Sequence, residues 1–290
     1  MSPLRIVAVM TCFNRRETTL RCLGCLAASA AQAGVAPEAV LMDDGSRDGT
    51  ADAVRAAFPW VRVLQGDGSL FWTRGMHRAQ AAALDGAAPD YLLWLNDDTL
   101  LLPDALARLL ATAQDKQHLH GRAVCVAGAT SDAATGALSY SGQVATSRWR
   151  RFSFRKVFSE REALRCDTMN GNIVLLPVAA VRAVGNLDPA FDHGGGDIDY
   201  GLRLRECGVP LYVAAGIAGH CSNNPSAGGY TDTTAPLRQR WRHILHRKGL
   251  PVRTWLPLTR RHGGLLWPLH FAWPYVKVLG SSCLAALKRR

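Results

Sequence analysis

The first 115 residues alternate between short apolar runs and segments with helical periodicity, and this alternation restricts the chain to a small set of folds. Strands are expected at residues 4–11, 40–42, 61–64 and 91–95, and helices at about 17–32, 48–58, 74–85 and 103–114. Chains that alternate in this way form a mainly parallel sheet covered by helices. We therefore expect an α/β fold.

Acidic residues follow the second and the fourth of these expected strands. Asp43 and Asp44 come directly after residues 40–42, and Asp97 and Asp98 come after residues 91–95. Ligands of open parallel sheets bind at the carboxyl ends of the strands, and neighbouring carboxylates there supply oxygen ligands for a hard divalent cation. Helix capping or a turn explains either pair alone. Their presence after two strands of one sheet favours a shared site.

The net charge of +11 is distributed unevenly along the 290 residues. Twelve basic residues and no acidic residue follow Asp232, so residues 1–232 have a net charge of −1. The basic segment contains aromatic residues and ends in an apolar run, 265–287, which His270 and Lys277 interrupt. This pattern predicts an amphipathic element on a membrane surface rather than a crossing helix. A solvated helix that covers the rest of the protein is the alternative.

The eight cysteines are scattered, and the single CxxC, Cys22 to Cys25, has no second pair at zinc-finger spacing. We interpret them as reduced thiols, most of them packing residues, with a structural zinc as the alternative. No secretory leader is predicted, because Arg5 is followed at once by the apolar run 6–10 and then by polar residues. A cytoplasmic location is expected.

Four ordered segments resemble the signatures of glycosyltransferase family 2. They are Thr11-Cys12-Phe13-Asn14-Arg15, Asp43-Asp44-Gly45-Ser46 with Asp48-Gly49-Thr50, Asn96-Asp97-Asp98, and Gly196-Asp197-Ile198-Asp199-Tyr200-Gly201-Leu202-Arg203-Leu204. The resemblance covers roughly residues 4–220. It implies the GT-A fold, in which a Rossmann-like nucleotide half and a mixed acceptor half share one sheet, and it implies inversion at the anomeric carbon. We expect this domain to span residues 1–232, with halves at about 1–115 and 116–232, followed by a basic, aromatic-rich helical extension at 233–290.

The resemblance also suggests which residues bind the donor nucleotide. Thr11 and Phe13 match residues that line the nucleobase and ribose, and Asp44 matches the carboxylate that accepts from a pyrimidine ring N–H. Arg74 falls where the family often places groups that touch the diphosphate or sugar, although a solvated arginine at a helix start explains it equally. The other donor candidates in the matched segments are Asn14, Arg15 and Asp97, with Asp97 expected near the ribose or donor sugar.

A divalent cation is implied by the same resemblance. Asp98 matches the metal-binding end of the family's DxD-type motif, and His220 lies where relatives often place a histidine near the metal or diphosphate. Mg²⁺ or Mn²⁺ at such a site neutralises charge that develops on the leaving diphosphate. A structural or solvent-facing histidine is the alternative for His220, since oxygen donors suit Mn²⁺ better.

Asp197 matches the family's catalytic base, the carboxylate that takes the proton of the acceptor hydroxyl. The family usually has Glu-Asp here, whereas this chain has Gly196-Asp197, so Asp199 becomes a substitute candidate. We favour instead a dipole-balancing role for Asp199 at a helix N-terminus. The further acceptor-side candidates are Trp72 and His193.

These features together predict an inverting, metal-dependent glycosyltransferase that uses a UDP- or dTDP-linked sugar and a saccharide or lipid-linked acceptor. The resemblance and the basic extension suggest bacterial surface polysaccharide synthesis, in the manner of rhamnosyltransferases or related members, at the inner face of the cytoplasmic membrane. A nucleotidyltransferase is the first alternative, but residues 11–16 lack the glycines of a phosphate loop. A nucleic-acid-binding protein would explain the basic extension and leave the acidic strand ends unexplained. A P-loop enzyme is excluded, since GxxxxGK[ST] is absent.

Overall fold

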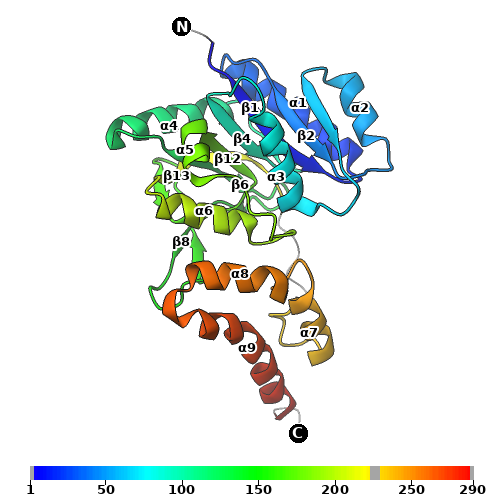
Figure 1. Ribbon diagram of the computed structural model, residues 1–290, viewed down its shortest axis with the longest axis vertical. Helices are drawn as coiled ribbons and strands as arrows, with labels where there is room; N and C mark the ends of the chain where they lie inside the picture. The colour runs from blue at the N-terminus through cyan, green and yellow to red at the C-terminus, as the bar shows by residue number, and fades with distance from the viewer. Residues whose placement is uncertain (1–2, 223–228, 288–290) are drawn as a thin grey trace.

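The structure is a computed structural model that describes residues 3–222 and 229–287, with side chains up to residue 281. The last three basic residues of the expected extension, 288–290, lie outside the described residues. A twisted sheet with strand order β10-β13-β6-β12-β4-β1-β2-β3 forms the centre of the molecule, and helices cover both of its faces (Figure 1). The expected α/β architecture is confirmed.

The amino-terminal half contains the parallel strands. Strand β1 pairs with β2 on one side and with β4 on the other, and β2 pairs with β3, all in parallel. All four strands therefore end at the same edge of the sheet. The elements of this half are β1 (Ile6–Cys12), α1 (Arg16–Gln32), β2 (Ala39–Asp43), α2 (Thr50–Ala57), β3 (Val61–Gln65), α3 (Phe71–Ala83) and β4 (Tyr91–Leu95).

The second half of the sheet is mixed, as expected. Strand β12 runs antiparallel to both β4 and β6, while β13 runs parallel to β6. A small sheet of order β11-β8-β9 lies beside it. The elements are β5 (Leu100–Leu101), α4 (Ala105–His120), β6 (Cys125–Ser131), β7 (Leu138–Tyr140), β8 (Gly142–Ala145), β9 (Phe154–Lys156), β10 (Leu164–Cys166), β11 (Thr168–Met169), β12 (Ile173–Pro177), α5 (Val178–Val184), α6 (Gly196–Glu206) and β13 (Leu211–His220).

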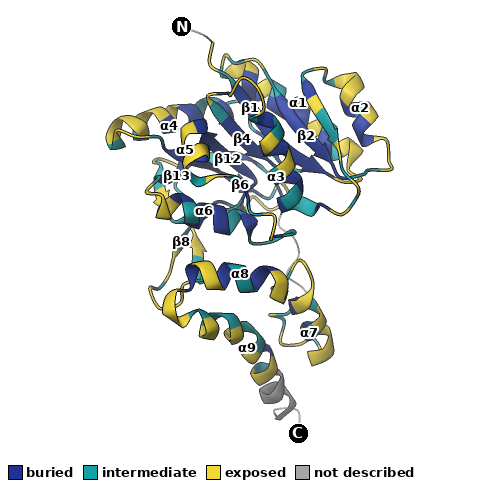
Figure 2. Cartoon of the chain, in the orientation of Figure 1, coloured by how far each residue is buried: buried dark blue, intermediate teal, exposed yellow. Residues whose placement is uncertain are grey.

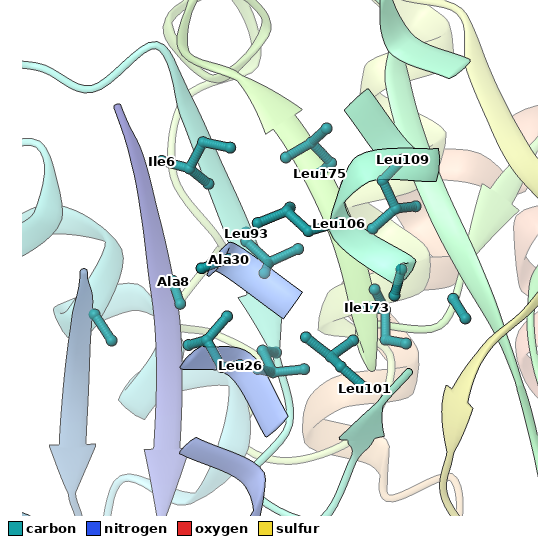
Figure 3. Packing of buried hydrophobic residues seen from close by; sticks show 14 of the residues in the cluster. Ile6, Ala8, Leu26, Ala30, Leu93, Leu101, Leu106, Leu109, Ile173 and Leu175 are labelled. Carbon is teal, nitrogen blue, oxygen red and sulfur yellow. The ribbon is translucent and has the colours of Figure 1, made fainter. Parts of the chain in front are cut away.

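Side-chain alternation along the buried strands produces two cores, one on each face of the sheet. In β1, Ile6 and Ala8 face the helices α1 and α4, whereas Val7 and Val9 face α3 and the opposite layer. Figure 3 shows the first core, where Leu26 of α1 and Leu106 of α4 pack over the strands. Strands apolar on both faces are typical of parallel sheets enclosed by helices.

The extension consists of α7 (Leu237–Leu245), α8 (Val252–His262), the short 3-10 helix η1 (Gly264–Leu266) and α9 (Trp267–Leu287). These helices lie below the sheet domain, with α8 beneath α6 (Figure 1). Trp255 and Leu258 of α8 pack on the buried Phe191 of the domain. Most of the outer surface of α9 is exposed (Figure 2). Across the described ranges, no helix has both the length and the apolar character needed to cross a membrane.

Helix α3 begins at Phe71, three residues before the start predicted from the periodicity. Its first turn is held by Asp44, whose carboxylate accepts hydrogen bonds from the backbone N–H groups of Gly68, Leu70 and Phe71. This capping carboxylate comes from the end of β2 rather than from the residues that precede the helix. Local capping rules therefore do not detect it.

Candidate active site

Asp44 is a buried carboxylate with 3% of its surface exposed. Its three backbone donors, at 2.9–3.2 Å, compensate the cost of burying a charge. Gly66 lies so near that a Cβ there would be 3.0 Å from the Cα of Asp44. Asp44 thus fixes the β3–α3 loop against the carboxyl end of β2.

Asp97 and Asp98 at the end of β4 share one guanidinium. Nη1 of Arg15 lies 3.0 Å from Oδ1 of Asp97 and 2.8 Å from Oδ2 of Asp98. Burial raises the pKa of Asp97 to about 7, and the positive charge of Arg15 opposes this effect. Oδ2 of Asp97 is buried without a hydrogen-bond partner among the described residues. The site therefore holds carboxylate oxygens that a further cation or donor would satisfy.

The end of β13, which contains His220, lies beside the segment that follows Asp98. His220 pairs in register with Leu100, two residues after Asp98, and the thiol of the next residue, Cys221, lies 3.5 Å from Oδ1 of Asp98. The Nδ1 atom of His220 forms a hydrogen bond with Ser131 at 3.1 Å, which orients the ring.

These residues form an incomplete ligand set for a metal ion. No cluster of three or more His, Cys, Asp or Glu side chains suited to a metal occurs in the described part of the chain. Mg²⁺ and related ions are commonly held by one or two protein carboxylates, with the other ligands supplied by phosphates and water. The partly exposed Asp98, the unsatisfied oxygen of Asp97 and the nearby His220 fit an ion of this kind, which binds together with a phosphorylated ligand.

Asp197 lies in the first turn of α6 and is partly exposed. Its carboxylate accepts hydrogen bonds from the backbone N–H groups of Ile198 at 2.9 Å and Gly171 at 3.2 Å. Burial raises its pKa, and these hydrogen bonds oppose the rise. A carboxyl group whose pKa is raised is a stronger base once ionised, which suits proton abstraction.

The segment after β1 lies against the loop after β2. Asn14 adopts a left-handed backbone with φ of 51°, its N–H donates to Ser46, and its Oδ1 accepts from the N–H of Arg47. Thr11 is buried and donates to the carbonyl of Met42. Phe13 is 51% exposed at the edge of this surface, where an aromatic ring is available to a flat ligand.

Trp72 connects three of the candidate segments. Its Nε1–H donates to Oδ1 of Asn96 at 2.7 Å, next to Asp97. A Cβ on Gly171 would lie 2.5 Å from Cη2 of Trp72, so the indole packs directly on the backbone that donates to Asp197. Trp72 therefore has a positioning role in addition to any contact with an acceptor.

Arg74 and Asp199 are both engaged with protein groups. The guanidinium of Arg74 pairs with Asp192 and donates to the carbonyl of Pro189. The side chain of Asp199 is fully buried and accepts from Arg203 at 2.8 Å, Arg261 at 2.6 Å and His262 at 2.9 Å. Neither oxygen of Asp199 is accessible to an acceptor, and its contacts instead connect α6 to α8.

Two residues of the site have no role predicted from the sequence: Asn96, which belongs to a matched segment and is the partner of Trp72, and Arg247, which lies over the ring of Phe71 at 4.0 Å from its centroid. Arg247 was considered only as part of the basic extension. Its contact joins residues far apart in the chain, and no local pattern reports such a pairing. The basic run at 246–248 is the sequence feature that points to Arg247.

Comparison with known proteins identifies the family of this chain. Residues 3–244 match the family described as Glycosyltransferase like family 2. The chain therefore belongs to this glycosyltransferase family. No curated protein matches the sequence.

Two solved structures show the same fold. One is GalNAc-T7 with UDP, GalNAc and Mn²⁺, with a TM-score of 0.55 and 14% identity over 78% of this chain. The other is the mannosyltransferase PcManGT from Pyrobaculum calidifontis in complex with GDP-Man and Mn²⁺, with a TM-score of 0.56 and 14% identity over 99% of this chain. The match spans 46% of the GalNAc-T7 chain and 76% of the PcManGT chain. The GT-A fold expected from the sequence is thereby confirmed.

Proposed function

We propose that this protein transfers a sugar, with inversion, from a nucleoside diphosphate to a saccharide or lipid-linked acceptor. One observation supports this most: three carboxylate segments far apart in the sequence meet around the start of α3. Asp44 accepts a hydrogen bond from the N–H of Phe71. The neighbouring Trp72 donates to Asn96, which precedes Asp97 and Asp98. The indole of Trp72 also packs on Gly171, whose N–H donates to Asp197.

In the proposed reaction, Asp197 accepts the proton of the acceptor hydroxyl while that oxygen attacks the anomeric carbon. The nucleoside diphosphate leaves from the opposite face of the sugar. Asp98, with Asp97 and His220 nearby, would hold Mg²⁺ or Mn²⁺, and a bound ion supplies charge neutralisation for the leaving diphosphate. The Mn²⁺ in both structural relatives supports this assignment.

We propose UDP or dTDP as the carrier of the sugar. Phe13 provides an exposed ring for the base, and Thr11, Asn14 and Arg15 border the same edge of the sheet. Asp44 would use a remaining lone pair for the ring N–H, because its oxygens already hold the β3–α3 loop. The relatives with UDP and GDP-Man support a nucleotide-linked donor. We propose a hexosyl or deoxyhexosyl group, such as rhamnose, galactose or N-acetylglucosamine, as the sugar.

The extension supports a location of the protein at a membrane surface. We place it at the inner face of the cytoplasmic membrane, in a bacterial surface polysaccharide pathway. Leu265 is 99% exposed and Trp273 is 64% exposed. A groove lined by Arg148, Arg151 and Leu265 joins cations to this apolar surface. Apolar side chains beside cations favour anionic lipid headgroups. Absence of binding to anionic vesicles at low salt would contradict this part of the proposal.

A thermal-shift screen of UDP, dTDP, GDP and CMP, each with Mn²⁺, tests the proposed activity. A ligand present at 100 times its Kd stabilises the folded state by about 2.7 kcal/mol, which produces a measurable rise in Tm. UDP or dTDP is expected to give the largest rise. Stabilisation by none of the four would refute a nucleotide-dependent transferase.

A further inference from the structure

The segment that joins α7 to α8 returns to the candidate active site. The guanidinium of Arg247 lies over Phe71, in the first turn of α3, at 4.0 Å from the ring centroid. The carbonyl oxygen of Arg247 lies 3.8 Å from the position that a Cβ on Gly194 would occupy, just before α6. Arg247 therefore contacts the first turn of α3, which contains Phe71, and lies beside Gly194, two residues before the start of α6, which contains Asp197.

The electrostatics of His193 place more charge at the same point. Burial lowers the pKa of His193, and the positive groups of Lys248, Arg247, Arg15 and His246 lower it further. Arg15 is the residue that bridges Asp97 and Asp98. The cations of the extension and Arg15, the partner of the sheet carboxylates, thus act on one side chain, His193.

The cations near His193 and the start of α3 differ in whether a carboxylate pairs with them. Arg15 pairs with Asp97 and Asp98, and Arg74 pairs with Asp192. Within residues 3–222 and 229–281, Arg247 and Lys248 form no ion pair. Uncompensated cations that lie close together favour an anionic ligand beside them.

The backbone of Phe71 adopts a conformation that costs conformational free energy. Phe71 has a φ of 54°, a left-handed conformation that is unusual for a bulky residue. The hydrogen bond from its N–H to Asp44 holds this conformation. The ring is thereby directed toward Arg247, which it orients by a cation–π contact.

We propose that Arg247 and Lys248 bind the diphosphate of the donor, so that the carboxy-terminal extension completes the donor site. This inference rests on the proposed function. A guanidinium held flat on an aromatic ring keeps its N–H edge free for phosphate oxygens, and Lys248 adds a second positive charge. The extension then has a part in substrate binding that is separate from any contact with a membrane.

The test compares Arg247→Gln, Lys248→Gln and the double variant with the wild-type protein. Arg242→Gln is the matched control, since Arg242 is an exposed cation of α7 in the same extension. Binding of UDP, dTDP and GDP with Mn²⁺, and of uridine and thymidine alone, is measured by calorimetry at two salt concentrations. Circular dichroism verifies that each variant is folded.

Loss of a charge-assisted hydrogen bond to phosphate weakens binding about 10-fold or more. Arg247→Gln should weaken binding of the nucleoside diphosphates by this factor, and the double variant should weaken it further. The salt dependence of that binding should also fall. Binding of the nucleosides should stay unchanged, and Arg242→Gln should bind the diphosphates as the wild-type protein does. Diphosphate binding that the double variant leaves at the wild-type level overturns this inference alone. A wild-type protein that binds none of these nucleotides overturns the proposed function and the inference together.

Discussion

Substitution of Asp199 by Asn should destabilise the protein and loosen the contact between α6 and α8. The carboxylate of Asp199 is fully buried and faces two guanidiniums and an imidazole at 2.6–2.9 Å. Asn retains the size of Asp, but it removes the negative charge and turns an N–H₂ group toward cationic donors. Arg203, whose side chain is 17% exposed, would then lack a carboxylate partner, and His262, whose side chain is 4% exposed, would keep only Glu206.

The expected magnitude follows from breaking a buried ion pair by removing one partner, which costs about 3 kcal/mol or more. For a chain of this size about 1 kcal/mol corresponds to a change of about 2 °C in Tm, so the Tm should fall by about 6 °C. Thermal unfolding at pH 7, followed by circular dichroism, measures this change. Glu206→Gln is the control, since Glu206 contacts His262 from a side chain that is 56% exposed, and it should cost less than about 1 kcal/mol.

The pH dependence provides a second check on the same residue. Burial favours the neutral form of Asp199, but the hydrogen bond from His262 and the charges of Arg203 and Arg261 outweigh it, so the pKa is lowered. A carboxyl group with a lowered pKa contributes stability above its unfolded pKa of about 3.9 and loses it as the pH falls through the folded value. The difference between wild type and Asp199→Asn should therefore shrink in acid below about pH 4. Equal Tm values for Asp199→Asn and Glu206→Gln at pH 7 would refute the reasoning.

Three further predictions concern the candidate active site. Asp197→Asn should lower kcat by about 100-fold or more while the Kd for the nucleotide stays unchanged, and near-normal turnover would assign the base to another residue. Because burial raises the pKa of Asp197, kcat/KM should rise with pH through a midpoint above about 3.9, and a profile that is flat down to pH 4 would argue against Asp197 as the base. Gly171→Ala should displace the Trp72 ring, cost about 1–3 kcal/mol and reduce activity, as measured by chemical denaturation and initial rates. The control is Gly24→Ala, because Gly24 lies in α1 and no atom lies within 4 Å of the position of its new Cβ. This substitution should stabilise the protein by up to about 1 kcal/mol. Equal effects of Gly171→Ala and Gly24→Ala on stability would contradict the packing argument.

The positions of the carboxylates along the sheet could be predicted from the sequence. Apolar runs such as 91–95 end at Asp97 and Asp98, and parallel strands that end at one edge bring such residues together. The family signatures added Asp197, which accepts from the N–H of Gly171, and the indole of Trp72 packs on that glycine. The roles assigned to Asp98, Asp197 and His220 stay predictions.

The sequence by itself determined the order of strands and helices, the family and the acidic strand ends, because periodicity and strand termination depend on neighbouring residues. Only the tertiary structure decided which charges are available to a ligand. Arg74 is paired with a residue 118 positions away, Asp199 with one 62 positions away, and α3 begins where a carboxylate 27 positions before Phe71 accepts its N–H. Such pairings are set by the packing of whole elements against one another, and local sequence contains no information on the distance between them.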